Sequence, residues 1–413
     1  MKSDRSTAKH LKLIEEHATK QMSGQYFVYH ATRNVLFTLG AWPSIDREKS
    51  IRPQARNFLL ICMTYTLLFC ELLPGILYWL IEKSTRIRLQ TIPLLLYDIL
   101  SVSQYGIFIF RRDQLGQCLK HVEEDWNNIS ADMRNIMLKS TKAGKHLAKI
   151  CGIFMYTGAF LFRTILPLSQ GKIVTDQNIT IRPFACPGYF FSLNIYASPV
   201  YEILFTIQCL TGIVMVSIVI SACGLTAIFV VHACGQLKIL IGLMKSLVQE
   251  SWLEEREMDK KLAQIVKHQI RVRSFLKLVQ HTLQEIYLIE IMVNTIATCV
   301  LLYFMILDWQ NKNITVLCIY LLSITNVTTH IFIFCYTGEQ LTGQAEKVAI
   351  ESCELEWYRL PNKKARNIIL LMIMSNTPTK LSAGKFVDLS LKTFGDIMKT
   401  SGAYFNVLRN VIE

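Results

Sequence analysis

The chain has 413 residues, of which 51% are hydrophobic and only 18% are charged, whereas about 25% of the residues in a soluble protein are charged. The apolar residues gather in runs longer than the core elements of a soluble domain, which excludes a disordered chain, a small disulfide-linked scaffold and an ordinary soluble enzyme. The formal net charge is +13. Because the basic residues lie between the apolar runs, we expect them to contact anionic membrane lipid and not nucleic acid. The composition predicts an integral membrane protein.

Six apolar segments are long enough to cross a bilayer, which takes about 20 residues of helix. In chain order they cover 57–81, 90–110, 150–168, 201–231, 286–307 and 314–337. Five of them contain a single charged residue. Glu202 lies at the end of its segment, whereas Glu71, Asp98, Arg163 and Glu290 lie within theirs and need an explanation. Such charges can form a proton or ion relay, or they can pair between neighbouring helices, and the sequence leaves both interpretations open.

A seventh helical segment, 384–409, is too polar for a hydropathy criterion but has its charges on one side. The charges are Asp388, Lys392, Asp396 and Lys399. At helical spacing they fall within about 80° of one another. One interpretation is an amphipathic helix that lies on the membrane surface. The other is a spanning helix whose polar face lines water.

The distribution of basic residues predicts the orientation of the chain. If the N-terminus is cytoplasmic, the inside segments hold 31 Lys and Arg residues and the outside segments hold 7. Because basic residues near helix ends favour the cytoplasmic side, we expect a cytoplasmic N-terminus and, with seven spans, an extracellular C-terminus. This orientation is the reverse of that of a G-protein-coupled receptor.

These observations predict an all-α fold, a seven-transmembrane helical bundle with a cytoplasmic helical anchor domain. The cytoplasmic N-terminal segment is 1–56, and spans one to six occupy 57–337. Spans four and five continue into the cytoplasm through 232–285, where apolar residues recur at helical spacing. The segment 338–378 contains an anchor portion and the short first half of the last helix, and breaks near Pro378 and Gly384 separate it from the second half, 384–409. The last helix is therefore expected to be split in two.

Motifs for enzyme chemistry are missing from the sequence. It contains no nucleotide-binding glycine loop, no serine-hydrolase elbow and no paired-histidine zinc motif. We therefore expect no enzyme activity, no cofactor and no catalytic or metal site.

Four short motifs along the chain are typical of one receptor family. They are LGAWP at 39–43, CYTGE at 335–339, WYRLP at 357–361 and KTSGAYFNVLR at 399–409. With the topology above, the chain resembles an insect odorant receptor over essentially its whole length. The motifs are most similar to the ant, bee and wasp (hymenopteran) expansion of that family. The chain is too short, above all in its second cytoplasmic loop, to resemble the shared co-receptor.

The resemblance implies a ligand-tuning subunit of a heteromeric ligand-gated non-selective cation channel for odorants or pheromones. It further implies four subunits around one pore, some supplied by the odorant receptor co-receptor, in the plasma membrane of olfactory sensory dendrites. The anchor domain would hold the subunits together, and 384–409 would line the pore. The alternative function is a G-protein-coupled seven-helix chemoreceptor, which requires the opposite orientation. A secondary transporter is a third possibility, but the sequence contains no internal repeat.

For the ligand site, we expect a pocket in the outer half of the bundle, between spans two, three, four and six. A small volatile or apolar ligand has few polar atoms, so burial of its surface must supply the affinity. A largely aromatic wall with a few hydroxyl groups meets this need. The expected ligand-binding residues are Tyr97, Ser101, Phe154, Thr157, Leu161, Tyr201, Phe205, Gln208, Tyr320 and Ile324.

The resemblance also implies a gate near the end of the last helix. Matching the family's Tyr-Phe and Leu to 404–408 assigns the gate to Val407, Asn410 and Val411. A ring of valines can dewet a narrow pore, and a ring of asparagines can coordinate a cation once the valines retract. Arg409 does not suit a cation pathway, and we expect it to face lipid headgroups or a neighbouring subunit. Alternatively, these residues are only the frayed polar end of the chain.

Overall fold

The computed structural model describes most of the chain. The described residues are 29–43, 51–170, 173–174, 180–190, 195–249, 254–311, 314–377 and 379–412. Within these ranges a few side chains are left undescribed, among them those of 404–412.

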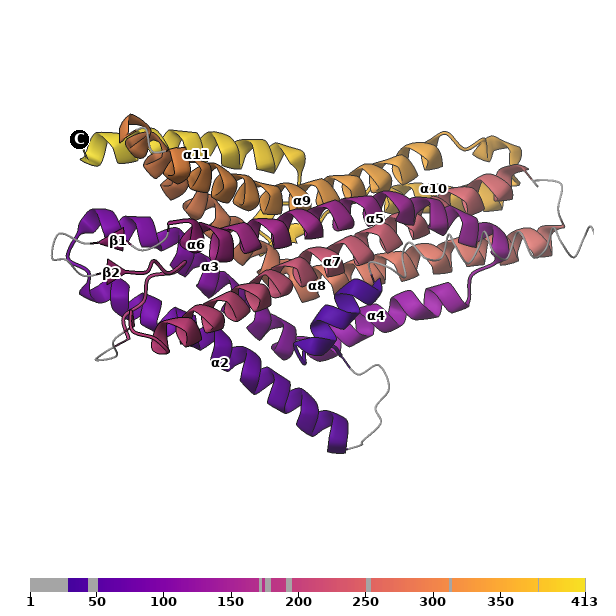
Figure 1. Cartoon of the computed structure of the whole chain (residues 1–413). Helices are drawn as coiled ribbons and strands as arrows, with labels where there is room; N and C mark the ends of the chain where they lie inside the picture. The colour runs from indigo at the N-terminus through magenta and orange to yellow at the C-terminus, as the bar shows by residue number, and fades with distance from the viewer. Residues whose placement is uncertain are drawn as a thin grey trace, which may run out of the picture.

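The described chain is a bundle of α-helices, several of them very long (Figure 1). In chain order these are α2 (Ile51–Ile81), α3 (Thr85–Phe110), α4 (Arg112–Asn127), α5 (Ala131–Phe160), α6 (Leu166–Gln170), α7 (Val200–Gln249), α8 (Glu255–Leu307), α9 (Ile314–Cys353), α10 (Asn362–Ser375) and α11 (Leu391–Ile412). A helix over 29–38 precedes them. A π-helical turn, η1 (Leu161–Ile165), continues α5, and two 3₁₀ turns, η2 (Asp308–Asn311) and η3 (Trp357–Arg359), follow α8 and α9.

Two antiparallel hairpins complete the described structure. Strand β1 (Ile173–Val174) pairs with β2 (Thr180–Ile181), and β3 (Ser382–Ala383) pairs with β4 (Val387–Asp388). The first hairpin lies at one end of the bundle, which we call the β1 end, and α10 lies toward the other, which we call the α10 end (Figure 1).

Within the described ranges, six helices are long and apolar enough to cross a membrane. They cover Gln54–Ile81, Thr85–Phe110, Lys149–Ser169, Val200–Gln249, Glu255–Leu307 and Ile314–Cys353. Each contains one of the six predicted apolar segments, which confirms the predicted all-α fold with several membrane-length helices. A helix is the expected form for such segments because lipid offers no hydrogen-bond partners to the backbone.

Helix α7 is the central helix of the bundle. In its most apolar window 83% of the residues are buried, against 22% in α2 and 17% in α9. Helix α8 runs beside it, and the apolar face predicted for the extension of α8 is buried at Ile265, Val279 and Leu283. Toward the α10 end, α4 packs against both long helices, whereas α10 packs against α9 and is hydrogen-bonded to α8 through Gln269 and Ser375. The extensions therefore bury their apolar faces against one another.

The last helix begins later than predicted. Helix α11 starts at Leu391, whereas the segment expected to be helical from residue 384 opens with the β3–β4 hairpin. The hairpin turn contains Gly384 at φ 55° and Lys385 at φ 67°. Two consecutive residues with positive φ are typical of a tight hairpin turn and incompatible with a right-handed helix. The prediction of a split last helix agrees with the structure, since α10 and α11 are separate.

The hairpin is docked on α8. The backbone N–H of Gly384 donates to the carbonyl of Gln284 at 3.0 Å, and the Gln280 amide donates to the Ser382 carbonyl at 2.8 Å. Asp388 consequently lies in β4, outside the helical stripe in which it was predicted, while Lys392, Asp396 and Lys399 lie on the exposed side of α11. Helix α11 packs on α8 and α9 and ends at the β1 end (Figure 1).

Candidate functional site

A cavity of about 230 Å³ lies inside the bundle, bounded by α3, α5, η1, α7, α8 and α9. Most of its wall is apolar, with side chains that include Leu94, Ala159, Phe162, Val293, Ala297 and Leu301. Ligand pockets in proteins usually have this composition, with a small number of polar groups that orient the ligand.

The polar floor of the cavity is built around a buried carboxylate. Glu290 of α8 is fully buried and lies 2.9 Å from His330 Nδ1 of α9. It also accepts hydrogen bonds from the amides of Asn294, at 2.9 Å, and Gln104. Asn294 and His330 belong to the cavity wall, so the carboxylate fixes the orientation of two polar groups that face a ligand.

Another part of the cavity contains Gln90, near the start of α3, and Tyr320, near the start of α9. The Tyr320 hydroxyl donates to Asp308 Oδ2 at 3.0 Å and accepts from the Gln90 amide at 3.3 Å. Asp308 also forms an ion pair with Arg86. These bonds fix the position of the Tyr320 ring at the cavity wall.

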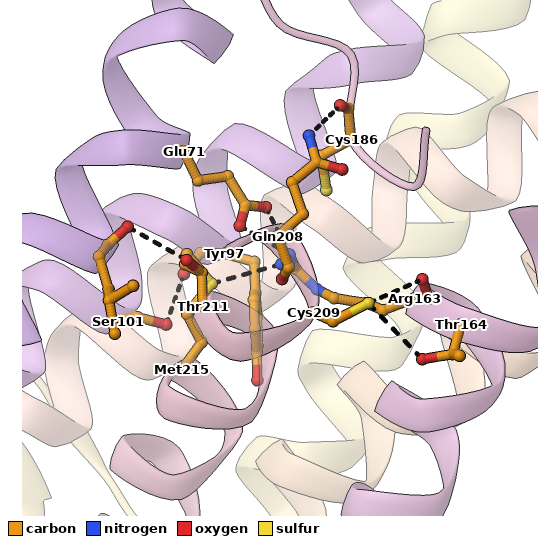
Figure 2. Close-up of polar contacts among 11 residues, drawn as sticks. Glu71, Tyr97, Ser101, Arg163, Thr164, Cys186, Gln208, Cys209, Thr211 and Met215 are labelled. Atoms are coloured by element: carbon orange, nitrogen blue, oxygen red, sulfur yellow. Dashed lines mark hydrogen bonds and ion pairs between the residues drawn. The ribbon is translucent and has the colours of Figure 1, made fainter. Parts of the chain in front are cut away.

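Another buried ion pair lies beside the cavity (Figure 2). Arg163 of η1 contributes to the cavity wall, and its Nη1 donates to both carboxylate oxygens of Glu71 at 2.6 and 2.7 Å. The same nitrogen lies 3.2 Å from the Gln208 carbonyl, and Nη2 contacts the Met215 sulfur. A Cβ atom on residue 212 would lie only 2.3 Å from Arg163 Cδ, so Gly212 of α7 makes room for the guanidinium stem.

Three of the isolated charges in the spans therefore have partners on neighbouring helices. Glu71 of α2 pairs with Arg163, which continues α5, and Glu290 has His330 as its partner. Asp98 is also buried and interacts electrostatically with both members of the first pair. For these groups the structure favours pairing between helices over an unpaired relay.

In a comparison with known protein families, residues 88–402 match the family described as 7tm odorant receptor. This range is more than half of the chain. The chain belongs to the odorant receptor family.

Individual relatives agree with this family. The chain is 26% identical to Odorant receptor 13a of Drosophila melanogaster over 302 residues, which are 69% of each chain. It is 21% identical to Odorant receptor 2a of the same fly over 164 residues, which cover 40% of this chain and 41% of that receptor.

A solved structure has the same fold. The insect olfactory receptor OR5 from Machilis hrabei, in complex with eugenol, has a TM-score of 0.81 to this chain at 16% identity, with 95% of this chain and 99% of that chain covered. A second structure of OR5 has a TM-score of 0.78. This odorant receptor is therefore a multi-pass membrane protein, and the comparisons favour the predicted function over the G-protein-coupled alternative.

The ten predicted ligand-binding residues of this odorant receptor lie in several places. Tyr97 and Tyr320 are in the cavity wall. Ser101 lies one turn beyond Tyr97 and donates to its carbonyl at 2.9 Å, without reaching the cavity. On α9, Ile324 is half-buried and lies outside the wall, although its neighbour Ser323 is part of it.

The predicted residues on α5, η1 and α7 face other surroundings. Phe154, Thr157 and Leu161 are half-buried or exposed and are not part of the cavity wall. Tyr201 and Phe205 stack on each other with ring centroids 5.8 Å apart. The buried Gln208 amide donates to the carbonyl of Cys186 at 2.8 Å.

The residues predicted to form the gate lie at the end of α11. The backbone of Val407, Asn410 and Val411 is helical, but their side chains lie outside the part of the chain that the structure describes.

Several cavity residues were not predicted. Helix α8 was not expected to contribute, yet it supplies Val293, Asn294, Ala297 and Leu301. Asn326 of α9 was also not among the predicted ligand-binding residues. In the structure it belongs to the cavity wall, and its Oδ1 atom is buried without a hydrogen-bond partner among the described residues.

Proposed function

We propose that this odorant receptor is a ligand-tuning subunit of a heteromeric odorant-gated non-selective cation channel. The observation that carries the proposal is the cavity between α3, α5, α7, α8 and α9, with an apolar wall and a polar floor. Its predicted partner is the odorant receptor co-receptor, in a complex of four subunits around one pore. Its predicted location is the plasma membrane of olfactory sensory dendrites.

The cavity chemistry supports a small, mostly apolar ligand with one polar group. Burying about 250 Å² of apolar ligand surface contributes roughly 6 kcal/mol, at about 25 cal/mol per Å², before the entropy cost of binding. The unpaired Asn326 Oδ1 can accept a hydrogen bond, and the nearby His330 and Asn294 add polar contacts. An alcohol or another hydrogen-bond donor fits these groups better than a pure hydrocarbon. The OR5 structure with eugenol also supports a small-molecule ligand.

We further propose the orientation that the basic residues predict, with the α10 end in the cytoplasm and the β1 end outside. Helix α11 would then present Lys392, Asp396 and Lys399 to a water-lined pore, and its end at the β1 end would place the gate, Val407, Asn410 and Val411, near the outer surface. An N-terminal epitope that antibodies reach in intact cells would contradict this orientation.

The ligand site is tested by recording currents from cells that express the chain with the co-receptor. The stimuli are volatile alcohols and hydrocarbons of matched length. We expect Tyr97→Ala and Tyr320→Ala to shift the half-maximal concentration at least about tenfold, since removing an aromatic side chain from an apolar wall costs more than about 1.4 kcal/mol of binding. Phe205→Ala, an equal truncation outside the cavity wall, is the control. Unchanged curves for both tyrosine variants would contradict this ligand site.

The channel function is tested in the same cells. Odorant currents that persist under G-protein blockade support a channel, whereas their complete loss would favour the G-protein-coupled alternative. Val407→Ala is expected to increase the current in the absence of odorant, because a ring of smaller side chains leaves a wider opening that water enters more easily. An unchanged basal current and ion permeability would place the gate on other residues or subunits.

A further inference from the structure

A polar cluster outside the odorant cavity lies where α4 packs against α7 and α8. His121 and Asp125 are one turn apart on α4, and His232 faces them from α7. His232 Nε2 lies 3.0 Å and His121 Nδ1 lies 3.4 Å from the same oxygen, Asp125 Oδ2. One possible ligand atom from each residue falls within 4.8 Å of the other two. We propose that these three residues bind a divalent transition metal ion of the zinc class.

The donor set and its spacing suit such an ion. Two imidazoles and one carboxylate are typical zinc ligands, and they leave a fourth position open for water or another group. Ligand atoms about 2.1 Å from a tetrahedral zinc ion lie roughly 3.4 Å from one another. The two separations from Asp125 Oδ2, 3.0 and 3.4 Å, are close to this value, and all three ligand atoms lie within 4.8 Å of one another. Side-chain movements, chiefly of the imidazoles relative to each other, would admit the ion.

The atoms that would bind the ion are available for it. His121 Nδ1 is buried, and apart from its 3.4 Å approach to Asp125 Oδ2 it has no hydrogen-bond partner among the described residues. The Gln236 side-chain amide nitrogen donates to Asp125 Oδ2 at 3.2 Å. If the amide group rotates by 180°, its oxygen takes the place of this nitrogen and faces the proposed metal position. Gln236 can therefore supply the fourth ligand.

The surrounding charges also allow a cation. Arg271 of α8 donates from Nε to Asp125 Oδ1, which leaves Oδ2 directed at the histidines. A hydrogen bond of this kind to the second oxygen is typical of carboxylates that bind metals. The guanidinium also lies 3.3 Å from the Glu124 carboxylate. Two carboxylates thus outweigh one guanidinium, and the site keeps a net negative charge.

The site is enclosed but reachable. The Phe275 ring lies against both imidazoles, with centroid distances of 4.9 Å to His121 and 5.2 Å to His232. The His232 side chain is 0% exposed, whereas those of His121 and Asp125 are 19% and 10% exposed. The ion would enter from the α4 side and would join α4 to α7 and, through Arg271, to α8.

The test uses the full chain purified without a histidine tag, stripped of metal with a chelator and equilibrated with zinc chloride. Zinc content per chain and the midpoint of thermal unfolding are then measured. We expect one zinc per chain and a higher midpoint with zinc than without it. His121→Gln and Asp125→Asn should each raise the zinc dissociation constant at least about tenfold, since even groups that only support a ligand contribute this much.

The control is His268→Gln, which removes a neighbouring histidine that binds the Gln236 carbonyl and is not in the triad. It should keep the zinc stoichiometry of the unmodified chain. His121 is partly exposed, so its variant is expected to fold even if the Asp125 variant does not. The proposal is overturned if the unmodified chain holds less than one zinc, or if His121→Gln retains the same zinc content and the same shift of the midpoint.

Discussion

Replacing Arg163 by methionine removes the cation from a buried ion pair and leaves its carboxylate partner in place. The side chains of Arg163 and Glu71 are 9% and 3% exposed, and one guanidinium nitrogen reaches both carboxylate oxygens. Without Arg163, the Glu71 carboxyl would lose its cation in a medium that solvates charge poorly, and Asp98 would also lose its nearby cation. The substitution therefore removes far more than one hydrogen bond.

The expected loss follows from this burial. Removing one partner of a buried pair costs about 3–5 kcal/mol, because an uncompensated charge remains. With two carboxylates affected, we expect the upper part of that range for Arg163→Met. The double variant with Glu71→Gln should recover part of the loss, since it removes the carboxylate that Arg163 contacts directly. Arg182→Met is a matched control, because the Arg182–Glu202 pair is exposed and contributes about 0–1 kcal/mol.

Unfolding of the purified chain in detergent, followed by intrinsic fluorescence during denaturant titration, measures these differences. The reasoning fails if Arg163→Met costs no more than Arg182→Met. It also fails if the double variant is no more stable than the single one, because the loss would then come from packing and not from an unpaired charge.

Three further predictions concern packing and reactivity. Gly338→Ala should reduce the amount of the chain that surface labelling detects on intact cells. The added Cβ atom would lie 2.2 Å from the Leu389 carbonyl oxygen, a backbone atom that cannot move aside. Gly343→Ala on the same helix has open space around the added atom and should be labelled like the unmodified chain. Tyr105→Phe should lower the free energy of unfolding, measured by denaturant titration, by about 1–3 kcal/mol. The reason is that the Leu39 carbonyl, which accepts a 2.6 Å hydrogen bond from the Tyr105 hydroxyl, would be left without this donor. An unchanged free energy of unfolding would show that water replaces the hydroxyl. Burial raises the pKa of the Cys118 thiol to about 11, so N-ethylmaleimide at pH 8 should modify it only after unfolding, and rapid labelling of the folded chain, detected by peptide mass spectrometry, would contradict this.

The membrane-length helices were predictable because their signal is local. A run of about 20 apolar residues can satisfy its backbone in lipid only as a helix, so run length alone locates the six segments. The family motifs were equally local, and the family match confirms the resemblance that they carried. The late start of α11 was harder to predict from the sequence. Gly384 marked a break, but nothing in a lysine at position 385 indicates the left-handed conformation that closes the hairpin.

The cavity depends on how each helix is rotated about its axis, and the sequence constrains this weakly when a helix is apolar on all sides. Tyr97 and Tyr320 were predicted as ligand contacts and are in the cavity wall, whereas Phe154 and Phe205 are not. Whether any of them binds an odorant stays a prediction. The pairing of Glu71 with Arg163 joins residues 92 positions apart. Such contacts are set by the tertiary fold, so the isolated charges could be noticed in the sequence but not matched.

The uninterrupted length of α7 and α8 restricts how such a chain can change over evolution. At 1.5 Å per residue, helices of 50 and 53 residues are about 75 and 80 Å long. Insertion of one residue within either would rotate everything beyond it by about 100° and turn the buried faces of that half outward. An insertion of seven residues would leave the register shifted by only about 20°. Insertions and deletions of single residues should therefore accumulate in the segments between the helices. Within α7 and α8, evolution should retain only substitutions and insertions that add whole helical turns.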